Sequence, residues 1–119
     1  MFLKNKKFVT PRAFARHVPG EIVTARVLNP IESRGCVNGK ARPAILIRRD
    51  GARWLIMGLT TRPNFADGTP RTPVPNPAVC GLGDRISFLW GSTTWISALD
   101  VGDHIGEADG DLLSLIALH

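Results

Sequence analysis

The chain contains no tyrosine, only two cysteines and no long hydrophobic run. No apolar segment approaches the roughly 18 residues that a membrane-spanning helix needs, so we expect no contact with a membrane. The first residues, MFLKNKKF, carry charges but lack the apolar centre of a signal peptide, which favours a cytoplasmic location. Cys36 and Cys80 form no CxxC pair, and no histidine lies at ligand spacing from either. The sequence therefore predicts no metal site, and no cofactor is expected.

Basic residues are missing from the last part of the chain. All 15 Lys and Arg lie in residues 1–85 beside five Asp and Glu, which gives this part a net charge of +10. Residues 86–119 hold the other five acids and no Lys or Arg, a net charge of −5. A basic body favours an anionic partner such as nucleic acid. A solvated surface on which the charges happen to segregate explains the asymmetry about equally well.

The length of 119 residues and the 44% apolar composition predict one small folded domain. We assign residues 1–18 to a basic N-terminal arm with a short helical turn after Thr10-Pro11, and residues 19–119 to a single domain. Ile22–Leu28 is rich in β-branched residues and predicts a first strand. The polar segment 29–41 that follows is a long loop for so small a domain, which is typical of a binding loop.

The centre of the chain predicts a β-hairpin. Ala44–Arg49 and Arg53–Leu59 form its strands, and Asp50-Gly51 is its turn signal. Both faces of these strands are apolar, which indicates central strands of a sheet. One expected face carries Ile45, Ile47, Trp54 and Ile56, and the other carries Ala44, Leu46, Leu55 and Met57.

The register of this hairpin decides what lies at its open end. A two-residue turn at Asp50-Gly51 places Arg42 opposite Leu59, whereas a shift of one residue places it opposite Thr60. The apolar pattern does not choose between the two registers, because a one-residue slip exchanges two faces that are both apolar. In either register, the side chains at positions 42 and 60 are neighbours.

Residues 62–85 hold five prolines and predict an irregular excursion with at most a short strand near Val74. Two further strands are expected over Arg85–Trp90 and Thr94–Leu99, joined at Gly91-Ser92-Thr93. The chain ends in a predicted helix that Asp109 caps, with an apolar stripe of Leu112, Leu113, Leu115 and Ile116. Short strands, long loops and one terminal helix favour a mainly β protein, a small partly open barrel.

The order of three elements resembles the PemK/MazF family of bacterial toxins from toxin–antitoxin pairs. These elements are Gly20-Glu21-Ile22-Val23 at the first strand, Arg42-Pro43-Ala44-Ile45-Leu46, and Leu59-Thr60-Thr61 at the close of the hairpin. The resemblance covers roughly residues 19–62, with a looser strand–helix match over 104–119. It implies an SH3-like barrel with a C-terminal helix. It also implies a homodimer, inhibition by a cognate antitoxin, and a growth-inhibiting hydrolase that cleaves single-stranded RNA without metal.

The resemblance also implies roles for individual residues. Arg42 and Thr60 are the expected catalytic residues at the scissile phosphate. The expected RNA-binding residues are Ser33, Arg34 and Lys40, with Gly35, in the loop after the first strand, and Thr61 and Arg62 after the hairpin. A guanidinium suits this task because it donates two parallel hydrogen bonds to phosphate oxygens. Attack by the RNA 2′-OH would leave a 2′,3′-cyclic phosphate and a 5′-hydroxyl.

Other interpretations stay open. Some family members carry further Arg and Asp catalytic residues on a later strand, and the corresponding stretch SFLWGSTTWIS has neither. A catalytically inactive SH3-like module that binds nucleic acid or protein is therefore the alternative function. No general base is evident, since nothing in the sequence places His17 or His104 near Arg42. Trp90 and Trp95 suit either base stacking or packing, and Arg48, Arg49 and Arg53 suit either a solvated face or electrostatic guidance of RNA.

Overall fold

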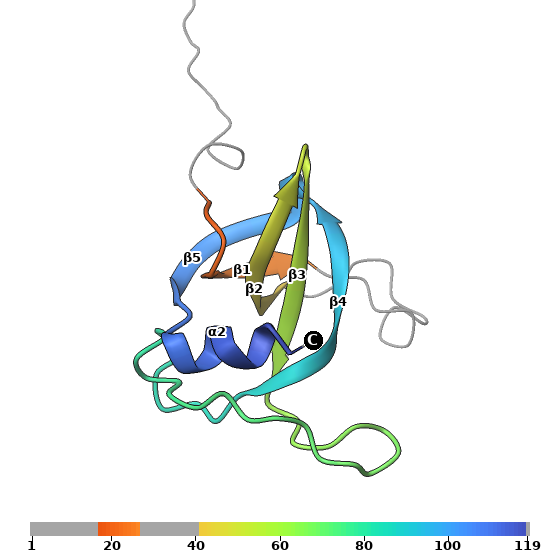
Figure 1. Cartoon of the computed structure of the whole chain (residues 1–119), viewed down its shortest axis with the longest axis vertical. Coiled ribbons are helices and arrows are strands. Elements are labelled where there is room, and N and C mark those ends of the chain that lie inside the picture. Colours follow the sequence, from red (N-terminus) through yellow and green to blue (C-terminus); the bar gives the residue numbers. More distant parts are fainter. Residues whose placement is uncertain (1–16, 27–40, 119) are drawn as a thin grey trace, which may run out of the picture.

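The computed structural model describes residues 17–26 and 41–118 as a mainly β protein with one short C-terminal helix (Figure 1). The strands are β1 (Glu21–Arg26), β2 (Ala41–Asp50), β3 (Arg53–Thr60), β4 (Phe88–Ser97) and β5 (Val101–Glu107). They form one antiparallel sheet in the order β4-β3-β2-β1-β5. Strands β4 and β5 arch along opposite sides of the β2–β3 hairpin in Figure 1. The predicted hairpin strands are therefore central, as their two apolar faces indicated.

The register of the hairpin differs from the simple two-residue turn in two respects. Asp50 pairs with Arg53, so the turn residues are Gly51 and Ala52 rather than Asp50 and Gly51. Gly51 has a φ of 61°, a left-handed conformation that glycine adopts without steric cost. Nearer the open end, Leu46 pairs with Ile56 whereas Arg48 pairs with Leu55, so Ile47 is an extra residue in a β-bulge.

The bulge at Ile47 determines which side chains share a face. Residues directly opposite each other lie on the same face, and the structure pairs Leu46 with Ile56 and Ile45 with Met57. The predicted grouping of Ile45 with Trp54 and Ile56 is therefore wrong. It assumed an unbroken register, and one extra residue on one strand reverses the correspondence of faces across the pair.

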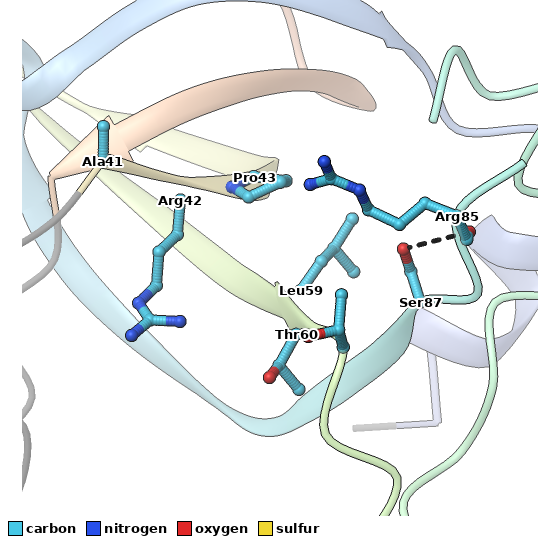
Figure 2. A pocket seen from close by; sticks show the side chains of 8 residues that line it. Ala41, Arg42, Pro43, Leu59, Thr60, Arg85 and Ser87 are labelled. Carbon is cyan, nitrogen blue, oxygen red and sulfur yellow. Dashed lines mark hydrogen bonds between the residues drawn. The ribbon is translucent and has the colours of Figure 1, made fainter. Parts of the chain in front are cut away.

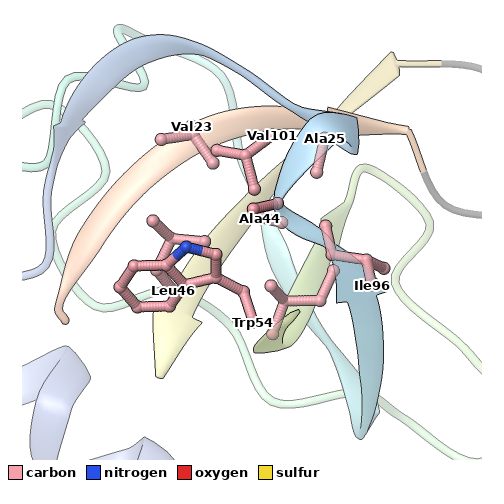
Figure 3. Close-up of a cluster of buried hydrophobic side chains, with 9 residues drawn as sticks. Val23, Ala25, Ala44, Leu46, Trp54, Ile96 and Val101 are labelled. Atoms are coloured by element: carbon pink, nitrogen blue, oxygen red, sulfur yellow. The ribbon is translucent and has the colours of Figure 1, made fainter. Parts of the chain in front are cut away.

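Two buried clusters occupy the two faces of the sheet. The inner cluster, shown in Figure 3, draws on all five strands and the short 3₁₀ turn η2 (Ala98–Asp100): Val23, Ala25, Ala44, Leu46, Trp54, Ile56, Ile96, Ala98 and Val101. The outer cluster lies between the opposite face, the 74–82 segment and the terminal helix: Ile22, Ile45, Met57, Leu59, Val74, Cys80, Leu89 and Leu112. The central strands thus contribute side chains to both clusters.

Strand β4 runs without a break where two shorter strands were expected. Gly91-Ser92-Thr93 lies inside Phe88–Ser97, and the predicted break there is wrong. Gly91 has a φ of 102°, and the pairing with β3 shifts register between Met57 and Leu59. A glycine and a register shift bend a strand without ending it.

Strand β5 is absent from the residue-based prediction because VGDHIGE combines two glycines with three charged or titratable side chains, a composition poor in β-formers. It forms one edge of the sheet and pairs irregularly with β1. Helix α2 (Gly110–Ile116) begins as predicted, with the Asp109 carboxylate accepting a hydrogen bond from the Leu112 N–H at 3.0 Å. Of its apolar stripe, Leu112 is fully buried but Leu113 is 45% exposed, so that position was assigned to the buried face wrongly.

The proline-rich excursion contains no named strand, in agreement with the sequence, and Arg71 fastens it to the sheet. The Arg71 guanidinium lies 4.6 Å from the Phe65 ring centroid and 4.9 Å from that of Trp90. It also donates a hydrogen bond of 2.8 Å to the Asn64 carbonyl. Trp90 is therefore engaged in packing the loop against β4. Within residues 17–26 and 41–118, no helix is long and apolar enough to cross a membrane.

Candidate functional site

A pocket of about 230 Å³ lies at the open end of the β2–β3 hairpin (Figure 2). It forms because the two strands separate there. Pairing between β2 and β3 extends from Asp50–Arg53 to Ala44–Gly58; beyond this point β2 continues beside β1 and β3 beside β4. Pro43, the first residue past the last pair, has no N–H with which to extend the ladder. The pocket is lined by Ala41, Arg42, Pro43, Leu59, Thr60, Thr61, Arg85 and Ser87.

Arg42 and Thr60 both line this pocket. Continued past Ala44–Gly58, the register that follows the Ile47 bulge places Arg42 level with Thr60, the second of the two arrangements that the sequence left open. Arg42 is partly exposed, and Thr60 is only 6% exposed. One charged donor and one hydroxyl from adjacent strands are thereby placed at the same concave surface.

The Thr60 hydroxyl has a fixed role as acceptor. Its Oγ1 accepts a hydrogen bond of 3.2 Å from the backbone N–H of Arg62, two residues along the chain. A hydroxyl has one hydrogen to donate in addition to its acceptor lone pairs. The local turn therefore orients Thr60 and leaves its O–H able to donate to an oxygen in the pocket.

Arg85 and Ser87 complete the pocket, and neither was among the predicted site residues. The segment that carries them is held by two backbone hydrogen bonds of 2.8 Å, from Val74 N–H to the Ser87 carbonyl and from Leu89 N–H to the Thr72 carbonyl. Figure 2 shows Arg42 and Arg85 on opposite sides of the pocket, with Leu59 and Thr60 between them. The one signal in the sequence was that Arg85 is the last basic residue of the chain and lies two residues before the stretch SFLWGSTTWIS in which a further arginine was sought.

The remaining predicted RNA-binding residues divide into two groups. Thr61 is exposed and lines the pocket, whereas Arg62 is exposed but not part of the lining. Arg62 instead contributes its backbone, through the N–H that binds Thr60 and a carbonyl that accepts from Arg71 at 3.4 Å. Ser33, Arg34, Gly35 and Lys40 lie outside the described residues.

The two described histidines lie away from the pocket, His104 on β5 and His17 just before β1. His17 and His104 each place Nδ1 against the buried carboxylate of Glu21, at 3.0 Å and 2.8 Å. Burial raises the pKa of Glu21, but the hydrogen bonds from His104, His17 and the Val18 N–H together outweigh it, and the net pKa is lowered. Glu21 is four residues along β1 from Ala25, the partner of Arg42, which corresponds to about 13 Å. Both imidazoles are thus held at the single carboxylate of Glu21, away from the pocket.

The pocket is consequently basic and hydroxyl-bearing. No His, Asp or Glu is among the described residues that line it. Within residues 17–26 and 41–118, no group of three or more His, Cys, Asp or Glu side chains is arranged to hold a metal ion. Two guanidiniums and three hydroxyls in one hollow suit a tetrahedral oxyanion such as a phosphate group.

No protein-family model matches this chain, and a search of curated proteins finds no match.

Proposed function

We propose that this protein is a toxin-type endoribonuclease that cleaves single-stranded RNA without metal. The observation that carries this proposal is the convergence of Arg42, Thr60 and Arg85 on one pocket at the open end of the hairpin. Arg42 and Thr60 are the two residues that the PemK/MazF resemblance assigns to the scissile phosphate. Arg85 adds a second cation on the opposite wall, from a segment 25 residues further along the chain than Thr60.

The proposed reaction uses the RNA as its own nucleophile. The 2′-oxygen attacks the adjacent phosphorus, the bond to the 5′-oxygen breaks, and the products are a 2′,3′-cyclic phosphate and a 5′-hydroxyl. Negative charge gathers on the non-bridging oxygens during attack. Arg42 and Arg85 would stabilise that charge from two sides, and each such donor accounts for about 3 kcal/mol in well-studied enzymes. The Thr60 hydroxyl would hold one phosphate oxygen in place.

Proton transfer is the less assisted part of this scheme. With no imidazole or carboxylate among the described lining residues, the 2′-OH would lose its proton to solvent and the leaving 5′-oxygen would gain one from solvent. General acid–base catalysis typically contributes about 10²–10⁴-fold to an enzymatic rate. We therefore expect slow turnover that rises with pH as hydroxide becomes more abundant.

The proposal extends to the fold and the partners that accompany such an activity. We propose that the curved five-stranded sheet with its terminal helix is an SH3-like, partly open barrel, that the protein acts as a cytoplasmic homodimer, and that a cognate antitoxin inhibits it. Exposed apolar side chains on and after α2, Leu113 at 45% and Leu118 at 82%, offer surface for such contacts. Light scattering would test the dimer. Growth arrest on expression, relieved by co-expression of a small acidic neighbouring protein, would test the toxin role.

The decisive experiment is incubation of the purified protein with mixed-sequence RNA in EDTA, followed by analysis of the ends. Fragments with 5′-hydroxyls and cyclic phosphates are expected. Arg85→Gln should slow cleavage about 100-fold because it removes one aimed donor. Arg26→Gln is the matched control, since Arg26 is an exposed arginine that does not line the pocket. Absence of cleavage by the wild-type protein would refute the nuclease proposal.

One observation favours a second candidate. A pocket with cations and hydroxyls but no acid or base among its described residues also suits an SH3-like module that binds nucleic acid without cutting it. Tight RNA binding that weakens steeply with salt, without cleavage at any pH, would identify this alternative.

A further inference from the structure

The turn end of the β2–β3 hairpin carries a second arginine cluster, distinct from the pocket. Arg48 of β2 pairs with Leu55 of β3, and Leu55 pairs with Trp95 of β4. Directly paired residues share a face, so Arg48 and Trp95 lie on the same side of the sheet. Arg53 is two residues before Leu55 and lies on that side as well. We name Arg48, Arg53 and Trp95 the turn-end patch.

Both arginines of this patch pack against one indole. The Arg53 guanidinium carbon is 4.6 Å from the Trp95 ring centroid, and that of Arg48 is 5.4 Å away. A guanidinium held over an aromatic ring keeps its N–H groups in the plane of the fork, where they remain able to bind an anion. Because the ring already restricts these long side chains, less conformational entropy is lost when they take up a ligand.

The turn-end patch is open and retains positive charge. Arg48 and Arg53 are exposed, and Trp95 is half-buried. The carboxylate of Asp50 lies 3.3 Å from Arg53, with both side chains more than half exposed. Exposed pairs of this kind contribute little free energy, so a phosphate can replace Asp50 as the partner of Arg53. The side chains that α2 and the 74–82 segment cover are elsewhere on this face, at Ile45, Met57 and Leu59.

We infer that the turn-end patch is a second contact surface for the phosphate backbone of the single-stranded RNA whose scissile phosphate occupies the pocket. The inference rests on the proposed function for the identity of the ligand. Six residues of β2 separate Arg48 from Arg42, a distance of about 20 Å along the strand, and the two side chains lie on opposite faces of the sheet, since Arg42 shares its face with Ala44 and Leu46 of the inner cluster. An RNA therefore has to pass around the rim of the sheet at the open end of the hairpin to contact both places, which a long strand can do and a very short one cannot. The patch would therefore set affinity for long RNA without taking part in the chemistry.

The chain offers a closely matched control for this inference. Arg49 is adjacent to Arg48 and carries the same charge, but it pairs with Trp54, whose side chain belongs to the inner cluster. Arg49 therefore lies on the opposite face, and its Nε donates to the Gly51 carbonyl at 2.7 Å. Arg48→Gln and Arg49→Gln change the net charge equally but alter opposite faces of the sheet.

The experiment measures binding of non-cleavable 2′-O-methyl RNA of about 4 and about 16 nucleotides, which span the range of single-strand site sizes, as a function of salt. The double variant Arg48→Gln/Arg53→Gln should weaken binding of the long RNA about tenfold or more. A plot of the logarithm of the binding constant against the logarithm of the salt concentration should also become shallower, its slope changing by about 0.7 for each phosphate that the variant no longer neutralises. Binding of the short RNA and the thermal midpoint of unfolding should stay unchanged, and Arg49→Gln should shift long-RNA affinity by less than Arg48→Gln.

Equal weakening by Arg48→Gln and Arg49→Gln would overturn the inference, because a general charge effect would then explain it. Unchanged binding of the long RNA by the double variant would overturn it as well. Failure of the proposed function is distinguishable from failure of this inference. In that case unmodified RNA would stay intact in the cleavage assay, although binding of the long 2′-O-methyl RNA would still depend on the turn-end patch. If the wild-type protein bound neither oligonucleotide, both proposals would be wrong.

Discussion

The two ends of the β2–β3 hairpin use arginine in two different settings. At the open end the strands part, and Arg42 lines a hollow that it shares with Thr60 and Arg85. At the turn end the strands stay paired, and Arg48 and Arg53 lie on a half-buried indole at an exposed surface. The same side chain is confined in the first setting and open to solvent in the second.

The two settings differ in the chemistry that they permit. A concave site partly excludes water, so charges there interact more strongly and donors can be aimed at one group. An exposed site is screened by salt and contributes chiefly to the attraction of a polyanion. Substitutions at the two ends should therefore differ in kind as well as in size.

The largest effect is expected for Arg42→Gln. Loss of the guanidinium at the pocket should lower cleavage of a short RNA by about 100-fold to 1,000-fold, as for other aimed donors to a developing oxyanion. Arg49→Gln, at the turn end and away from the turn-end patch, should leave the rate within about twofold. Initial cleavage rates in EDTA measure the effect of each variant. Comparable losses of rate in the two variants would contradict the assignment of catalysis to the open end alone.

Thr60→Val should have the next largest effect. It keeps the shape of the side chain but removes the hydroxyl, and a hydrogen bond to a charged group contributes about 1.5–3 kcal/mol, or roughly 10-fold to 100-fold in rate. Thr60→Ser restores the hydroxyl and should recover most of the activity. A serine variant as slow as the valine variant would indicate that Thr60 acts through packing alone.

Glu21→Gln tests a site that belongs to neither end. At neutral pH the loss of the carboxylate that holds His17 and His104 should lower the free energy of unfolding by about 2 kcal/mol. The folded-state pKa of Glu21 is lowered from its usual 4.5, so its stabilisation is complete above that pH and is lost as the pH falls through the folded value.

The variant should therefore lose stability less steeply below pH 4.5 than the wild-type protein, as measured by denaturant unfolding at several pH values. Asp67 and Asp109, whose pKa values are lowered by hydrogen bonds from Thr69 and Leu112 respectively, keep some acid dependence in both proteins. Identical acid profiles would contradict the stabilising role of the Glu21 cluster.

The smallest effect is expected for Gly51→Ala at the turn. Gly51 has a φ of 61°, and no atom lies within 4 Å of the place that an added Cβ would occupy, so the cost is that of a left-handed backbone alone, about 1 kcal/mol. Ala52→Ser, one residue further on, is the control and should change stability by less than about 0.5 kcal/mol. Cleavage of a short RNA should be unchanged in both variants, because neither residue is near the pocket.

Local patterns in the sequence were sufficient for several elements. The central hairpin, the irregular proline-rich excursion and the Asp109 cap of α2 follow from short-range signals, and the structure agrees with each. Strand β5 was missed because its residues have little intrinsic preference for a strand and acquire that form by pairing with β1. The break assigned within β4 was wrong because a glycine there accommodates a bend that pairing with β3 sustains.

The candidate site was predictable only in part for a similar reason. Arg42 and Thr60 could be paired because a hairpin brings residues of known separation together. Arg85 could not, since its approach to the pocket depends on the path of the whole 61–87 segment and on the hydrogen bonds that hold it near β4. The side of the sheet on which Arg42 lies was also beyond a local pattern, because it depends on one unpaired residue.

That unpaired residue, Ile47, determines which face of the sheet each preceding side chain of β2 occupies. If Ile47 were paired in register instead of bulged, the turn and β3 would be unchanged, but every side chain from Ala41 to Leu46 would lie on the opposite face. Ile45 would then enter the space of the inner cluster, and Pro43 would take the place of Arg42. The single bulge thus determines the composition of both hydrophobic layers and of the pocket together, whereas most single substitutions affect only one of them.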